Sequence, residues 1–167
     1  QRQMCIRDRH YVLKIMRKID IKGGQFTYAQ RIELGRIMAG PGEETAKMIA
    51  CMKCLVPGWS FLNIRASIKW WPEVVEGLHY WIQRENKELH KSPSAEERAA
   101  GIADLQRRVG YMGVVTTIAK EYGVDPDTVL SWKYGKVFNL LYTDMQRALF
   151  RERIEKNREM KRKQKRK

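Results

Sequence analysis

Residues 118–132, IAKEYGVDPDTVLSW, restrict the fold more than any other segment because they have the spacing of a helix-turn-helix. Ala119 is followed four positions later by Gly123, and Val129 comes six positions after that glycine. In this motif a small residue lets the second helix approach, glycine permits a left-handed turn, and a buried β-branched residue fixes the second helix. The spacing therefore predicts two short helices that pack across a tight turn.

The chain then continues into a long stretch with helical periodicity. Apolar residues recur at intervals of four, four, four and five positions: Val137, Leu141, Met145, Leu149 and Ile154. A stripe this dense predicts one long amphipathic helix that begins at about Tyr134.

Capping residues and helix breakers predict more helices upstream. Thr27 can cap the first helix, and Ser94 and Glu97 have the spacing of a capping box. Pro72 suits the first position of a helix, where its missing N–H costs nothing. Gly110 and Gly113 are expected to interrupt or kink the helix that contains them. The expected helices cover residues 28–38, 43–56, 72–90, 95–109 and 114–122, with a short one that opens at Pro126.

Two segments do not have helical periodicity. Residues 11–21 partly alternate and are rich in β-branched side chains, which predicts a strand or an extended arm that ends at Gly23-Gly24. Residues 59–71 are compatible with a short strand or a loop. The predicted fold is mainly α: a multi-helix single domain over residues 10–150, with a small N-terminal β element and a long C-terminal amphipathic helix.

The first nine residues, QRQMCIRDR, resemble the conceptual translation of a sequencing-adapter remnant. The chain also begins with Gln rather than Met. We therefore interpret residues 1–9 as a non-native leader and leave them out of the fold prediction.

Composition limits the class of protein. A chain of 167 residues with 43% apolar and 10% aromatic residues is expected to fold as one domain. No apolar run approaches the roughly 18–20 residues that span a bilayer, and no secretory signal is recognisable. These features predict a cytoplasmic protein without a membrane partner.

The net charge of +14 is concentrated at the C-terminal end. Residues 151–167 hold ten Lys or Arg and three Glu, a net charge of +7. Such a basic tail can bind phosphates without reading sequence, or it can be a solvated helix end in which cations offset the helix dipole. Both interpretations stay open. The candidate nucleic-acid contacts in this tail are Lys161, Arg162, Lys163, Lys165, Arg166 and Lys167.

Neither a metal site nor a catalytic site is indicated. Cys51 and Cys54 lack a second ligand pair, and on one helix face they are expected to pack in the core. No metalloprotease, nucleophile-elbow, phosphate-loop or dinucleotide motif occurs. The acidic pairs each fall in the first turn of a predicted helix, where acids offset the dipole: Glu43-Glu44, Glu96-Glu97 and Asp125/Asp127. The sequence therefore predicts a protein that is not an enzyme and carries no cofactor.

Five segments, in order, carry a resemblance to a known family. They are KIDIKGGQFTY at 18–28, RIELG at 31–35, WIQRE at 81–85, EERAAGI at 96–102 and DPDTVLSWKYGKVF at 125–138. Over residues 11–158 the chain resembles small phage and prophage proteins of Bacteroidetes-type genomes. Its last third is similar to the C-terminal part of tail assembly chaperones. Those proteins carry a G-x-x-P-x-x-V/I-x-x-W/L-x-Y-x-x-V segment before a final charged helix.

The resemblance implies a non-catalytic protein that binds a helical tail protein, the tape measure protein, in the cytoplasm of the bacterial host during tail assembly. A homo-oligomer is compatible with this role. The candidate partner-binding residues are the aromatic side chains of the last helices: Trp132, Tyr134, Phe138 and Tyr142. Because they occur at helical spacing, the competing interpretation places them in the core.

Two other functions remain open. A helix-turn-helix DNA-binding protein would use residues 115–136, with a recognition helix over 125–136 and with Thr128, Ser131 and Lys133 facing the major groove. The acids Asp125 and Asp127 would then meet phosphates unfavourably. A structural phage tail component would instead form stable homo-oligomers.

Overall fold

A computed structural model of the chain describes residues 19–90 and 92–165, and these residues are mainly helical. They form seven α-helices, together with one 3₁₀ turn (η1) and one π-helical turn (η2). The elements are α2 (Tyr28–Ala39), α3 (Glu44–Leu55), η1 (Phe61–Asn63), α4 (Ile64–Arg84), η2 (Glu85–Leu89), α5 (Ala95–Ala99), α6 (Ile102–Tyr122), α7 (Pro126–Ser131) and α8 (Tyr134–Lys165). The predicted leader at residues 1–9, and residues 11–18 of the predicted β element, lie outside the described range.

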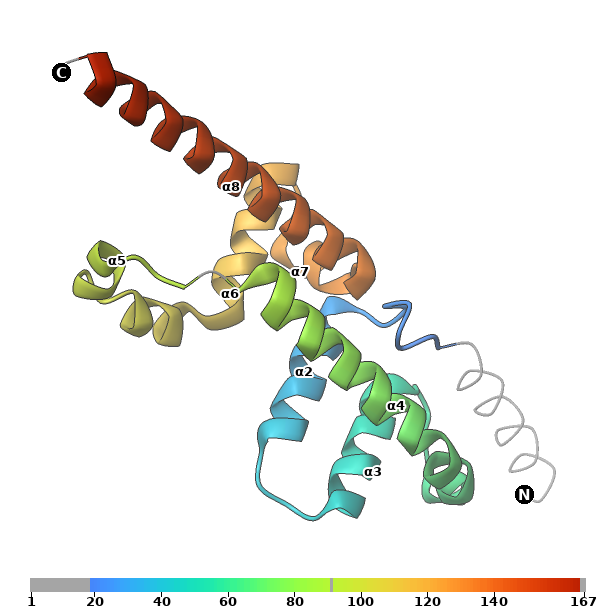
Figure 1. The fold of residues 1–167 in the computed structure, drawn as a ribbon. Coiled ribbons are helices and arrows are strands. Elements are labelled where there is room, and N and C mark those ends of the chain that lie inside the picture. The colour runs from blue at the N-terminus through green and yellow to red at the C-terminus, as the bar shows by residue number, and fades with distance from the viewer. Residues whose placement is uncertain (1–18, 91, 166–167) are drawn as a thin grey trace.

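The helices α2 and α3 form a hairpin on which α4 packs (Figure 1). α2 begins where predicted, because the hydroxyl of Thr27 accepts a hydrogen bond from the backbone N–H of Gln30. The Gln30 side chain in turn accepts from the backbone N–H of Thr27 at 2.8 Å. This reciprocal cap satisfies two amides that the helix leaves without partners.

The prediction for residues 59–72 is wrong. Phe61 opens a 3₁₀ turn, and α4 starts at Ile64, so Pro72 lies inside a helix of 21 residues rather than at its first position. A proline there removes one backbone hydrogen bond, at a cost of about 3 kcal/mol. The helix persists because its other face buries Trp71, Val74 and Leu78 in the core, while Pro72 itself is exposed. Tertiary packing thus outweighs the local helix breaker.

The helix-turn-helix prediction is confirmed in its geometry. Ala119 and Val129 are buried, and Gly123 adopts the left-handed conformation with φ 62°. The amide of Gly123 donates to the carbonyl of Ala119 and closes the turn. The predicted recognition helix over 125–136 is wrong in length, because α7 ends at Ser131 and Trp132 is extended.

The predicted long C-terminal helix is confirmed as α8, which contains 32 residues. Of its predicted stripe, Val137 is fully buried, whereas Leu141, Met145, Leu149 and Ile154 are half-buried. The first turns of α8 therefore pack in the core, and the remainder of the helix extends past the other elements (Figure 1).

The predicted kink is present in α6, at Gly110. This residue has φ 53° and ψ −141°, a conformation that L residues with a side chain rarely adopt. The kink divides α6 into a C-terminal half that joins the core and an N-terminal half that projects from the body together with α5 (Figure 1). In the described part of the chain, no helix is both long enough and apolar enough to cross a bilayer.

Candidate protein-binding site

The helix-turn-helix is joined to the N-terminal part of the fold by a short extended contact. Residues 132–135 run beside residues 24–28, and Thr27 and Lys133 form an isolated antiparallel bridge. The amide of Tyr28 donates to the carbonyl of Trp132 at 2.9 Å, and the amide of Tyr134 donates to Phe26 at 2.7 Å. These bonds explain the break between α7 and α8, because the backbone of residues 132–134 pairs across the molecule rather than within a helix.

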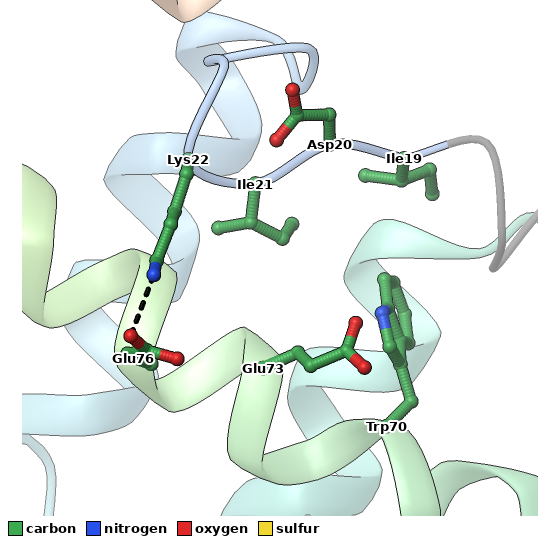
Figure 2. Close-up of a pocket in the computed structure, with 7 residues that line it drawn as sticks. All are labelled: Ile19, Asp20, Ile21, Lys22, Trp70, Glu73 and Glu76. Atoms are coloured by element: carbon green, nitrogen blue, oxygen red, sulfur yellow. Dashed lines mark hydrogen bonds and ion pairs between the residues drawn. The ribbon is translucent and has the colours of Figure 1, made fainter.

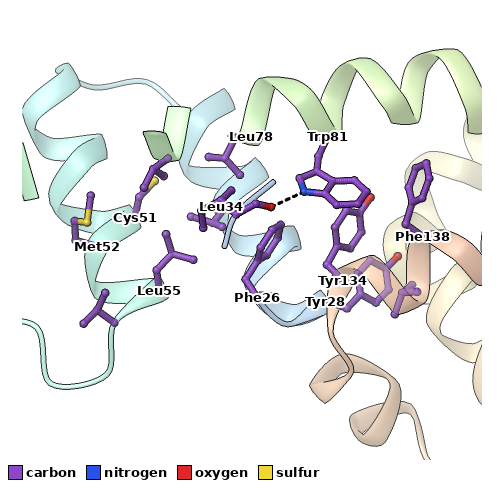
Figure 3. Packing of buried hydrophobic residues seen from close by; sticks show 14 of the residues in the cluster. Phe26, Tyr28, Leu34, Cys51, Met52, Leu55, Leu78, Trp81, Tyr134 and Phe138 are labelled. Carbon is purple, nitrogen blue, oxygen red and sulfur yellow. Dashed lines mark hydrogen bonds between the residues drawn. The ribbon is translucent and has the colours of Figure 1, made fainter. Parts of the chain in front are cut away.

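An aromatic cluster fills the space beneath this contact (Figure 3). The ring of Tyr134 lies 5.5 Å from that of Phe26 and 4.9 Å from that of Trp81. Phe138 meets Trp81 edge-on at 5.1 Å, and the indole N–H of Trp81 donates to the carbonyl of Ile21. The cluster therefore joins α4, α8 and the segment before α2 into one core.

A polar network borders the cluster. The Arg31 guanidinium donates two hydrogen bonds to the Glu85 carboxylate, at 2.8 and 2.6 Å. The hydroxyl of Tyr134 donates to the same carboxylate. Glu85 opens the π-helical turn at the end of α4, which aims its side chain at both partners. Polar groups on three separate elements thus satisfy one another at the edge of the core.

Burial and charge set the protonation states in this network. Burial raises the pKa of the Tyr134 hydroxyl well above 10, and the charge of Glu85 acts in the same direction. Burial alone would lower the pKa of Arg31, but its hydrogen bond to Glu85 and the attraction between their charges raise it overall. Tyr134 is therefore a neutral donor and Arg31 a permanent cation, an arrangement that suits a structural contact.

The structure divides the four predicted partner-binding aromatics. Tyr134 and Phe138 are 3% and 0% exposed, so the prediction that they form a surface is wrong and the core interpretation is correct. Trp132 is half-buried between the ring of Tyr122, at 5.8 Å, and the Lys136 ammonium, 3.5 Å from its ring centroid. Tyr142 is exposed and accessible to a partner.

The candidate DNA contacts of the helix-turn-helix are only partly free. Thr128 and Ser131 are exposed on α7, and the Ser131 hydroxyl donates to the carbonyl of Thr128. The Lys133 ammonium donates to the carbonyl of Gln25 at 2.7 Å, which holds it against the segment before α2. In the basic tail, Lys161, Arg162 and Lys163 are exposed on α8, and Lys165 is its last residue. Arg166 and Lys167 lie outside the described residues.

Sequence periodicity did not identify an exposed apolar surface on α6. On the projecting half of α6, Leu105 and Val109 are 57% and 41% exposed, and Tyr111 and Met112, just beyond the kink at Gly110, are exposed as well. Apolar residues at helical spacing usually face a core, so their periodicity gives no sign of this exposure. The sequence does contain one related signal, because the helix-breaking residues Gly101 and Gly110 lie at the two ends of this short segment and separate it from the rest of the helix.

An open pocket of about 350 Å³ lies between α4 and the segment before α2 (Figure 2). Trp70 and Glu73 face Ile19 and Asp20 across it, and Lys22 pairs with Glu76 at its rim. Asp20 accepts a hydrogen bond from the amide of Gly23, so its carboxylate stabilises a turn. The pocket is shallow and mixed in character, and nothing in its lining selects a ligand.

The cysteine prediction is confirmed. Cys51 is fully buried and Cys54 is half-buried, both as free thiols. Burial raises the pKa of Cys51 to about 12 and also raises the pKa of Cys54, so both remain protonated at neutral pH. Within residues 19–90 and 92–165, no group of three or more His, Cys, Asp or Glu side chains could hold a metal ion.

Comparison with protein-family models, with curated proteins and with solved structures finds no match for this chain. The function must therefore be inferred from the residues and from their arrangement.

Proposed function

We propose that this protein is a non-catalytic binder of a helical phage tail protein and acts as a tail assembly chaperone for a tape measure protein in the bacterial cytoplasm. The observation that carries the proposal is the exposed apolar surface on the projecting half of α6. Its members are Leu105 and Val109, which are 57% and 41% exposed.

The spacing of this surface suits a helical partner. Together with Ile102, these two residues follow intervals of three and four, which is the spacing of a coiled-coil seam. A seam of this kind accepts the side chains of a second helix between its own. Exposed apolar patches on a folded domain generally mark interaction sites, and an amphipathic helix is a common occupant.

Trp132 and Tyr142 supply additional candidate contacts, because both retain exposed ring surface after the core is formed. A structural tail component would use the same seam between copies of this chain. The chaperone is the better supported alternative, since the seam lies on a short projecting arm, which offers little area for a permanent oligomer.

The helix-turn-helix turn supports DNA binding as a second candidate function. Three features of the helix-turn-helix surface argue against DNA binding. The recognition helix is only six residues long, the acids Asp125 and Asp127 are exposed at its start, and Lys133 is held by Gln25. A short helix with acids at the DNA-facing end is poorly suited to a phosphate-lined groove.

Co-expression with a phage tape measure protein tests the proposal. The client is expected to become soluble and to copurify with the full chain. The double variant Leu105→Gln/Val109→Gln should lose most of this capture, while the matched control Leu62→Gln/Ile68→Gln, on exposed residues of η1 and α4, should retain it. A client that stays insoluble in the presence of the intact chain would overturn the proposal.

A further inference from the structure

The C-terminal part of α8 is a separate charged surface that the proposed function does not use. Tyr134, Val137 and Phe138 bury the first turns of this helix in the core. From Arg151 onward the side chains described are exposed, apart from Glu152 and Ile154. This half of α8 extends beyond the remaining elements (Figure 1), so a large ligand can approach it from several sides.

Cations and acids form neighbouring rows along this segment. Arg151, Arg158 and Lys161 are separated by seven and three residues, so they share one face of the helix. The acids Glu152, Glu155 and Glu159 are spaced by three and four residues and form a row beside it, which Glu155 borders as a neighbour of Arg151 and Arg158. One acid is already engaged, because Glu152 pairs with Lys156 at 3.0 Å. A continuous cationic face therefore remains beside the acidic one.

The segment offers no apolar stripe to a protein partner. Its only apolar side chains are Ile154 and Met160, and residues six positions apart lie on different faces of a helix. A helix or groove of another protein would need such a stripe for affinity. A polyanion does not need one, because phosphate contacts and the release of bound counterions supply its binding free energy.

We propose that the cationic face of α8, which includes Arg151, Arg158, Lys161 and Arg162, binds double-stranded nucleic acid through the phosphate backbone without reading sequence. From residue 151 to 163 the helix rises about 18 Å, at about 1.5 Å per residue. A duplex presents about one phosphate charge per 1.7 Å of its axis, so this length faces about ten charges. The surface is distinct from α7 and from the seam on α6, and the proposal does not depend on the client.

Fluorescence anisotropy with a labelled 20-base-pair duplex of arbitrary sequence tests the proposal. The full chain is compared with the quadruple variant Arg151→Gln/Arg158→Gln/Lys161→Gln/Arg162→Gln. At low salt the variant should bind at least tenfold more weakly. Its plot of log affinity against log salt should lose about three to four units of slope, since each phosphate contact contributes about 0.9.

A matched control removes four exposed cations elsewhere: Arg65→Gln/Lys69→Gln/Lys87→Gln/Lys120→Gln. This variant has the same net charge as the first and should keep the affinity of the intact chain within about twofold. Equal losses in the two variants would overturn the proposal, since they would show an effect of net charge alone. Tighter binding of poly-glutamate than of the duplex at equal charge concentration would overturn it in favour of an acidic protein partner. Strong preference for one duplex sequence would overturn it in favour of the helix-turn-helix.

Discussion

The aromatic cluster around residues 132–138, which we call the junction, and the projecting half of α6 carry similar apolar side chains. Those of the junction are buried, whereas those of the projecting half of α6 are exposed. Both place apolar residues at helical spacing, yet Phe138 is completely buried and Leu105 is 57% exposed. The junction is covered by segments about 50 and 110 positions earlier in the chain, through Trp81 and Phe26. The projecting arm consists of α5 packed on the start of α6. The difference shows that long-range contacts, rather than periodicity, decide which stripe becomes core.

Charged groups in the two regions show the same contrast. Arg31 and Glu85 form a bidentate pair that joins α2 to the end of α4 and is largely shielded from water. On the arm, Asp104 and Arg107 are three positions apart on one helix, and both are well exposed. An exposed pair of this kind contributes little to stability. Only the junction is therefore expected to respond strongly to substitution.

The largest expected effect concerns the aromatic core of the junction. Phe138→Ala should lower the free energy of unfolding by about 4 kcal/mol, because it leaves a cavity beside Trp81 and Tyr134. Urea denaturation followed by tryptophan fluorescence measures this change. Phe150→Ala, on the exposed part of the same helix, should stay within about 0.5 kcal/mol of the parent. Equal losses in the two variants would contradict the contrast.

A second effect concerns the close approach of two backbone segments. Gly24 has φ +67°, and a Cβ there would lie 2.6 Å from the amide nitrogen of Gly135 and 2.9 Å from the Trp81 ring. Gly24→Ala should therefore destabilise the fold by about 3 kcal/mol. Gly58 has φ +76° and open space around it, so Gly58→Ala should cost only about 1 kcal/mol. Thermal unfolding of the two variants separates the steric effect at Gly24 from the backbone effect that both share. Similar losses of stability in the two variants would show that residues 24 and 135 are not in contact.

A third effect tests the polar border of the junction. Glu85→Gln leaves the charge of Arg31 without a counterion and weakens the acceptor for Tyr134, so it should cost about 2 kcal/mol. Glu33→Gln removes the partner of Arg36 in an exposed pair and should change stability far less. Chemical denaturation at two salt concentrations checks both variants. A loss at Glu85 that disappears in high salt would indicate an exposed rather than a shielded pair.

The smallest expected effect lies on the arm. Leu105→Gln should leave the free energy of unfolding within about 0.5 kcal/mol, because most of the side chain is already in contact with water. Differential scanning calorimetry of the isolated chain measures this change. A loss of 2 kcal/mol or more would show that the arm packs against the body in solution, and the α6 seam would then not be a free binding surface.

Capping residues and glycines correctly predicted the helix ends that depend only on nearby residues. Thr27 caps α2 as expected, Ser94 with Glu97 forms the expected capping box, and Gly123 ends α6 in the expected left-handed turn. The start of α4 was missed, because the burial of Trp71 and its neighbours overrides the helix-breaking tendency of Pro72. The recognition helix was predicted too long, because its end is set by hydrogen bonds to residues 26 and 28 rather than by its own sequence.

By itself, the sequence determined the helical class, the helix-turn-helix turn, the buried thiols and the concentration of charge at the C-terminal end. Each of these follows from neighbours within a few positions, through capping, periodicity, glycine conformation or composition. Only the tertiary structure decided that Tyr134 and Phe138 are core, that Leu105 and Val109 are surface, and that the cations of α8 project away from the body. Burial depends on which distant segments cover a helix face, and residues 24–28 and 81–85 cover one stripe and leave the other exposed.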